Sequence, residues 1–216
     1  MALYLKETLK EKPDYPRQAL QIGKRLYDLL MPDRGIFTLS LYMLLNGLGY
    51  GVGYSLFRAM LFKHYGFTTV QLGLMSTAHS LIMSIALIPL GRVSDRFGRK
   101  IMLIISSVFS IITVLGFLFS NKFELFVLFQ ITFGLDIAFF QASWMPLISE
   151  LVSSKNLSKA IGKLDSYYTM IGFIAPSIGG VLYSSYGFST PLIVHFILMI
   201  ACLALVLTIK EPKQRF

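Results

Sequence analysis

Six long apolar segments, separated by connections that hold most of the charged residues, constrain this chain more than any other feature. Each can cross the ~30 Å hydrocarbon core of a bilayer, which takes roughly 20 helical residues. Only 14% of the residues are charged, against about 25% in an average soluble chain, and a soluble domain of 24.3 kDa could not hide so much apolar surface from water. We therefore predict an all-α membrane protein with six transmembrane helices, at residues 36–61, 68–90, 101–120, 125–149, 166–184 and 188–209.

The positive charges predict the orientation of these helices. Of the 20 Lys and Arg residues, seven lie in segment 1–35, four in connection 91–100, three in connection 151–165 and three in segment 210–216. With six spans, these four regions share one side, and an excess of positive charge marks the cytoplasmic side. Both termini are therefore predicted to be cytoplasmic, in a multi-pass protein of the cell (cytoplasmic) membrane.

The net charge of +9 is thus a signal of membrane topology. Binding to nucleic acid would need the same charges on one folded, water-exposed face, so we expect membrane lipid as a partner and no nucleic acid. The chain divides into a cytoplasmic segment 1–35, a helical bundle 36–209 and a basic tail 210–216. Apolar residues at helical spacing in the first segment, Ala19, Ile22, Leu26, Leu29 and Leu30, predict an interfacial amphipathic helix; a solvated tail is the alternative.

Residues 91–103 carry the most specific motif, with the sequence GRVSDRFGRKIML. It resembles the signature loop between the second and third helices of the major facilitator superfamily (MFS), whose pattern is G-x-L-a-D-R-x-G-R-K-x-x-L. The resemblance implies a gating role for this loop and a pairing of Glu150, at the cytoplasmic end of the fourth helix, with Arg96 or Arg99. The signature positions matched in this chain are Gly91, Asp95, Arg96, Gly98, Arg99 and Lys100.

Two further segments resemble the same family. Residues 175–180, APSIGG, are similar to its G-P-x-x-G-G element, and residues 130–136 are similar to its R-x-x-q-G-x-g element, with Gln130 in place of Arg and Asp136 in place of Gly. These two departures weaken an assignment to proton-coupled drug antiport. Small residues allow close helix packing, which we predict for Gly47, Gly49, Gly51, Gly53, Pro176, Gly179 and Gly180; kinking during transport is the alternative for the first four.

Complete members have two six-helix halves with the substrate site between them, and the resemblance covers the first, N-terminal half, over residues 36–212 of this chain. It implies a half-size transporter that moves a small-molecule substrate by alternating access, after pairing with a second copy or with a separate six-helix half. The alternative is a non-transporting membrane scaffold or regulatory partner that retains the half-fold. We expect no cofactor and no metal.

The resemblance places the substrate cleft between the first and fourth helices. At about 100° per residue, Gln130, Gln141 and Trp144 share one arc of the fourth helix, while Thr132, Asp136, Ser143 and Glu150 share another. The first arc is predicted to face the cleft, with plain core packing as the alternative. The first helix contributes Asn46, Tyr50, Tyr54 and Arg58, of which Arg58 either binds an anionic group or extends toward the membrane surface.

Asp136 lies near the middle of its predicted helix, where an ionised carboxylate costs several kcal/mol or more. His79 lies at a similar depth in the second helix, so we predict a His79–Asp136 pair within hydrogen-bonding reach, directly or through one water. Such a pair could bind and release a proton; a structural hydrogen bond that never titrates is the alternative.

An enzymatic function is not expected. Ser143 and His195 resemble the placement of a serine-protease pair in six-helix membrane proteins, but the chain lacks the G-x-S-G around the serine. Their predicted depths also differ by roughly 18 Å at the helical rise, too far for proton transfer. The chain contains no H-E-x-x-H motif and no phosphate-binding glycine loop.

Overall fold

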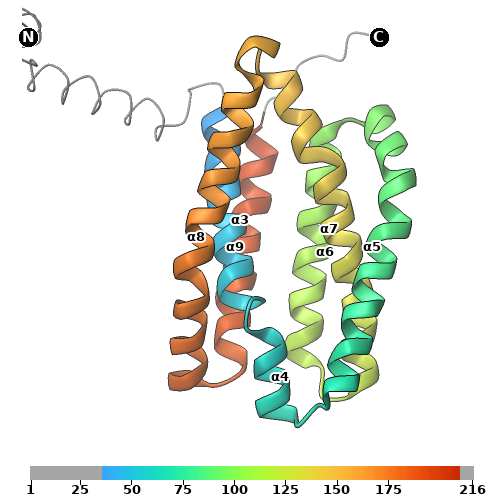
Figure 1. Ribbon diagram of the computed structural model, residues 1–216, viewed down its shortest axis with the longest axis vertical. Coiled ribbons are helices and arrows are strands. Elements are labelled where there is room, and N and C mark those ends of the chain that lie inside the picture. Colours follow the sequence, from blue (N-terminus) through green and yellow to red (C-terminus); the bar gives the residue numbers. More distant parts are fainter. Residues whose placement is uncertain (1–35, 210–216) are drawn as a thin grey trace, which may run out of the picture. The chain divides into compact units, whose positions relative to one another are not determined.

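The computed structural model describes residues 36–209, and every regular element in this range is helical (Figure 1). The predictions for segments 1–35 and 210–216 lie outside the described residues. The elements are α3 (Phe37–Gly53), α4 (Phe57–Tyr65), α5 (Thr69–Phe97), α6 (Arg99–Phe119), α7 (Phe123–Leu151), the 3-10 turn η2 (Ser154–Asn156), α8 (Leu157–Tyr186) and α9 (Ser189–Thr208).

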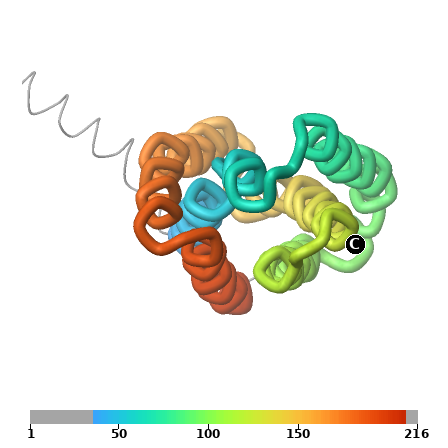
Figure 2. Tube along the Cα trace, turned by 90° about the horizontal axis from the view of Figure 1, so that it is seen from below, coloured from blue at the N-terminus to red at the C-terminus, as the bar shows by residue number. Residues whose placement is uncertain are grey.

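The long helices form two groups of three, as the view along the bundle in Figure 2 shows. Helix α3 packs against α8 and α9, helix α7 packs against α5 and α6, and a contact between α6 and α9 joins the groups. Exchanging α3 with α7, α5 with α8 and α6 with α9 reproduces the same set of contacts. Because α3 and α7 run in opposite directions (Figure 1), the bundle consists of two three-helix repeats of inverted topology, α3 with α5 and α6, and α7 with α8 and α9. Each group therefore combines helices from both repeats.

The first predicted span is two helices instead of one. Helix α3 ends at Gly53, and α4 begins at Phe57 after a short turn. The hydroxyl of Ser55 donates to the carbonyl of Gly51 and so competes for an acceptor of the helix ladder. The preceding glycines lower the helix propensity of this stretch, so the break falls where both effects meet.

Two predicted connections are shorter than expected. Helix α5 continues through the signature motif to Phe97, and Gly98 alone separates it from α6. Gly98 has φ = 93°, a conformation that favours glycine. Charged residues of this motif are compatible with a helix that extends beyond an apolar segment, which explains the difference from the predicted loop. Helix α8 likewise begins at Leu157, well before the predicted start at Ser166.

Four of the described helices, α5, α6, α7 and α9, are long and apolar enough to cross a membrane by length and composition. Helix α3 has 17 residues because of its break, fewer than the roughly 20 that a span needs; with α4 it covers residues 37–65. Helix α8 is long, but its sequence is diluted by Gly, Ser and charged residues. The first and fifth spans therefore do not meet this criterion.

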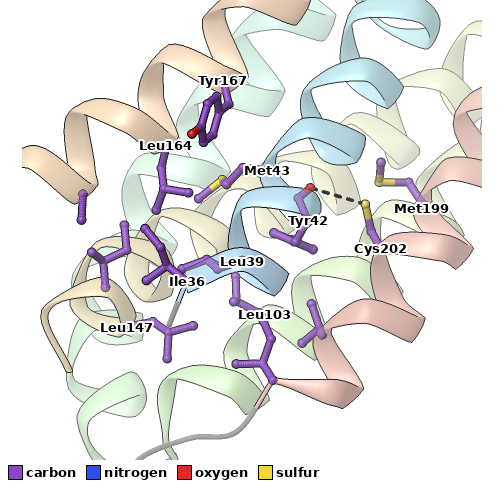
Figure 3. Close-up of a cluster of buried hydrophobic side chains, with 14 residues drawn as sticks. Ile36, Leu39, Tyr42, Met43, Leu103, Leu147, Leu164, Tyr167, Met199 and Cys202 are labelled. Carbon is purple, nitrogen blue, oxygen red and sulfur yellow. Dashed lines mark hydrogen bonds between the residues drawn. The ribbon is translucent and has the colours of Figure 1, made fainter. Parts of the chain in front are cut away.

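One part of the core lies where α3 meets α8 and α9. Figure 3 shows one buried cluster that contains Leu39, Tyr42 and Met43 of α3, Leu164 of α8 and Cys202 of α9. Tyr42 and Cys202 are fully buried, and the Cys202 thiol donates to the backbone carbonyl of Tyr42. Helix α3 is therefore the central helix of its group.

Glycines bring α3 close to both neighbours. Gly47 and Gly51 face α8, whereas Gly49 and Gly53 face α9. A Cβ at Gly53 would lie 2.6 Å from the Cβ of His195, and one at Gly51 would overlap Ala175. The two overlapping glycine pairs of the sequence thus serve two different helix contacts.

The G-P-x-x-G-G-like segment of α8 packs against the end of α3. A Cβ at Gly179 would overlap the backbone carbonyl of Val52, and one at Gly180 would lie 3.3 Å from the Leu56 side chain. Pro176 lies inside α8, with its Cδ 3.7 Å from a Cβ placed at Gly51. These residues adjoin the break between α3 and α4.

A valine at Gly179 should therefore separate α8 from α3. We expect Gly179→Val to lower the free energy of unfolding by about 1–3 kcal/mol, the usual cost of overpacking, as measured by denaturant titration in detergent micelles. Gly172→Val is the matched control, because it lies on the same helix with nothing within 4 Å of the added Cβ. Equal losses for the two variants would contradict close packing at Gly179.

Candidate functional site

A buried carboxylate lies at the centre of the bundle. Asp136, near the midpoint of α7, is 1% exposed. Its Oδ1 accepts a hydrogen bond of 2.7 Å from Ser106 of α6, and its Oδ2 accepts one from the Tyr50 hydroxyl of α3. The Tyr50 hydroxyl also lies 3.3 Å from the Ser110 hydroxyl. One carboxylate thus joins three helices and both repeats.

The predicted direct hydrogen bond between His79 and Asp136 is not formed: among the described residues, the Asp136 carboxylate accepts from Tyr50 and Ser106. Gly134 faces α5, with its Cβ position 2.6 Å from the backbone carbonyl of His79. Asp136 lies about 200° further around α7 and therefore faces α3 and α6. Equal depth in the membrane placed the two residues at one level, but the backbone of His79 and the side chain of Asp136 lie on opposite sides of α7. The His79 ring stacks on Phe133 at 4.7 Å, and its Nδ1 is buried without a hydrogen-bond partner among the described residues.

The serines that bind Asp136 were not predicted. Ser106 and Ser110 lie four residues apart on α6 and are both buried. With Ser107 and Thr113 they form a polar stripe on a helix that is otherwise apolar. That periodicity was the available signal, because a buried hydroxyl needs a hydrogen-bond partner.

The remaining cleft candidates of the first span lie in different environments. Tyr54 donates a 2.8 Å hydrogen bond to Gln130, which is 1% exposed. Asn46 is buried, and its Oδ1 has no hydrogen-bond partner among the described residues. Arg58 is exposed on α4. Gln130 therefore joins the interior contact between α3 and α7.

Gln141 and Trp144, the other members of that arc, line a cavity of about 460 Å³. Helices α3, α7 and α8 form its walls, and the sequence did not identify its α8 wall. Gln130 shares their angular position but lies about three turns away along α7. The described residues that line the cavity are Met43, Ile137, Phe140, Gln141, Trp144, Met145, Leu164, Asp165 and Tyr168.

The signature segment is tied to the end of α7 by Arg99. Its Nε donates to Glu150 at 3.2 Å, and its Nη2 donates to Asp95. Its Nη1 donates to the Ser94 hydroxyl at 2.9 Å, and that hydroxyl donates to the Ala142 carbonyl at 3.1 Å. Of the two arginines predicted to pair with Glu150, Arg99 lies beside it, while Arg96 is exposed.

The other signature residues have separate positions. The Lys100 ammonium donates to the carbonyls of Leu207 and Ile209 at 2.8 and 2.7 Å, so it caps the C-terminal end of α9, where a cation is favourable. Gly91 lies within α5 with nothing within 4 Å of a Cβ placed there. Gly98 forms the turn described above.

Ser143 and His195 do not form a catalytic pair. The Ser143 hydroxyl donates to the carbonyls of Phe139 and Phe140 in its own helix. His195 is buried on α9 against Gly49 and Gly53, with its ring edge-on to Tyr50 at 5.1 Å. Within residues 36–209, no three His, Cys, Asp or Glu side chains lie together in a way that could hold a metal ion.

Comparison with known proteins identifies the family. The model of the Major Facilitator Superfamily matches residues 39–216. The chain therefore belongs to this superfamily, as the signature segment predicted.

Individual relatives are similar at low identity. The chain is 28% identical over 207 residues to Solute carrier family 22 member 18 of Rattus norvegicus, covering 92% of this chain and 49% of that protein. It is 27% identical over 124 residues to Multidrug resistance protein 1 of Bacillus subtilis, covering 57% and 32%. An uncharacterized MFS-type transporter of Methanocaldococcus jannaschii is 28% identical over 126 residues, covering 58% and 33%. The chain thus spans half or less of the length of these relatives.

Arg99 should contribute more to stability than Arg96. We expect Arg99→Gln to lower the free energy of unfolding by about 1.5–3 kcal/mol, the range for hydrogen bonds to charged groups, because it leaves Asp95, Glu150 and Ser94 without their shared donor. Arg96→Gln removes the same charge at an exposed position and should have little effect. Denaturant titration in micelles compares the two, and equal losses would contradict the assignment.

Proposed function

We propose that this protein transports a small solute across the cell membrane by alternating access, as a six-span half that assembles with a second half. The observation that carries the proposal is the buried Asp136 carboxylate, which hydrogen-bonds Tyr50 of the first repeat and lies on α7 of the second. Ionisable groups inside a membrane bundle are costly and are usually functional. Membership of the superfamily supports the same conclusion.

Asp136 is well placed to respond to a proton. Among the described residues, the Asp136 carboxylate accepts hydrogen bonds from the hydroxyls of Tyr50 and Ser106, and protonation would change which group donates between Asp136 and Tyr50. That change occurs at the contact between the two repeats. We propose Asp136 with Tyr50 as the proton-responsive pair in place of Asp136 with His79.

The proposed topology has six spans with both termini in the cytoplasm. Helices α3 and α4 together form the first span, and α8 forms the fifth. Both ends of the described chain, at α3 and α9, lie at the end of the bundle that also carries the signature segment (Figure 1). The cytoplasmic assignment of that end follows from the excess of Lys and Arg.

Cysteine labelling tests this topology. In a Cys202→Ser background, single cysteines at Lys63, Lys122 and Tyr186 should react with a membrane-impermeant maleimide in intact cells, whereas cysteines at residues 154–160 should react only after permeabilisation. Labelling of residues 154–160 from outside would overturn the orientation. Protection of all positions in a folded protein would overturn the span assignment.

Pairing supplies the second half of the transport pathway. In a two-fold homodimer, Asp95 of one copy is proposed to approach residues 163–166 of the other, with the reciprocal contact required by symmetry. Asp95 is suited to such a contact, because its side chain is 67% exposed although it pairs with Arg99. A separate six-helix half is the other possible partner.

Reconstitution tests transport and pairing together. With cysteines at Asp95 and Ser166 in the Cys202→Ser background, we expect intermolecular disulfides and saturable uptake from a panel of labelled solutes into proteoliposomes. Asp136→Asn should abolish any pH dependence of uptake, whereas Glu124→Gln, an exposed carboxylate at the start of α7, should preserve it. Disulfide formation with no uptake of any solute would favour the scaffold alternative, and uptake without intermolecular disulfides would exclude this homodimer contact.

A further inference from the structure

We propose that the cavity between α3, α7 and α8 binds an organic cation that carries an aromatic ring. This inference rests on the proposed transport function, since it names the substrate class, but the binding itself requires no transport. The cavity volume of about 460 Å³ falls within the usual range for small-molecule sites, roughly 300–1,000 Å³. Its walls combine one carboxylate with several aromatic and sulfur-containing side chains.

The charge of the cavity selects a cation. Asp165 is the only charged side chain among the described residues that line it. Asp165 is exposed, and it lies three residues before Tyr168, on the same face of α8. Arg58, the candidate residue for binding an anionic group, lies on α4 and does not line the cavity. A carboxylate without a lining cation favours a positively charged ligand.

The aromatic walls suit the same ligand. On α7, the rings of Phe140 and Trp144 stack with centroids 6.2 Å apart and planes inclined by 15°. On α8, Tyr168 lies opposite, and Gly47 of α3 leaves room for its ring, with a Cβ position 3.1 Å from Tyr168 Cδ2. Aromatic faces attract organic cations as well as aromatic rings.

The remaining walls set the polarity and adaptability of the site. Gln141 supplies an amide, and Met43 and Met145 supply flexible thioether side chains that adjust to ligand shape. A ligand with many hydroxyl groups would find few partners here, because Gln141, Asp165 and Tyr168 carry nearly all of the polar side-chain atoms of the lining. The composition therefore disfavours a sugar and favours an amphiphilic cation.

Trp144 provides a direct readout, because it is the only tryptophan in the chain. We would titrate the detergent-purified full chain with benzyltrimethylammonium, with its neutral carbon isostere neopentylbenzene, and with the anion phenylpropionate, and record tryptophan fluorescence. We expect a saturable change with the cation at concentrations at least tenfold lower than with the isostere, and no saturable change with the anion.

Variants of Asp165 test whether its carboxylate is the group that distinguishes the cation from the neutral isostere. Asp165→Asn should raise the Kd for benzyltrimethylammonium at least tenfold and leave the response to neopentylbenzene unchanged. Asp165→Glu should restore most of the affinity. Glu124→Gln removes a carboxylate at the opposite end of α7 from the cavity and should leave both responses unchanged. If Asp165→Asn does not fold, the cation-to-isostere ratio of the wild-type chain still decides the question.

Equal affinity for the cation and the isostere, or a Kd for the cation that Asp165→Asn leaves unchanged, would overturn the proposal. The result is separable from the transport assay. Cation binding without uptake of any solute would contradict the proposed transport function and support this cation site. Solute uptake without a fluorescence response to the cation would support the transport function and contradict the cation site.

Discussion

The close packing of α3 against two helices at once determines where the polar groups of this bundle lie. Gly47 and Gly51 turn one side of α3 to α8, while Gly49 and Gly53 turn another side to α9. Asn46, Tyr50 and Tyr54 follow one another at intervals of four residues, so they share the third side. The glycines thus direct the longest polar side chains of α3 toward the second repeat, where Tyr50 binds Asp136 and Tyr54 binds Gln130.

The second group of helices has the same arrangement around α7. Gly134 brings α7 close to the backbone of α5, and Gly116 of α6 accommodates the Phe129 ring of α7. The remaining side of α7 presents Gln130 and Asp136. The central helices of the two groups are thus linked by hydrogen bonds through long tyrosine side chains, whereas within each group the helices interlock at glycines. Hydrogen bonds of this kind can exchange partners at lower cost than interlocked backbones can separate.

Much of this architecture could be predicted from the sequence, and the failures have specific causes. Apolar segments and glycine spacing indicated the helices and their contacts, because both depend on local pattern. The ends of α5 and α8 were misjudged, since charged residues end an apolar segment without ending a helix. The direct His79–Asp136 hydrogen bond is not formed, because depth in a membrane fixes a position along a helix and leaves its rotation undetermined. The contact of Gly134 with α5 sets that rotation. The α8 wall of the cavity required knowledge of which helices are neighbours.

The buried carboxylate and the cavity are distinct sites that share the same two helices. Asp136 faces the interior, while its neighbour Ile137 and Phe140, one turn further along α7, line the cavity. On α3, Tyr50 binds Asp136, and Gly47, one turn earlier, holds the Tyr168 ring at the cavity wall. A displacement of α3 relative to α7 would therefore change both sites together. If a proton on Asp136 and a ligand in the cavity favour different positions of α3, each must alter the affinity of the other by the same factor, because the coupling free energy between two binding sites is reciprocal.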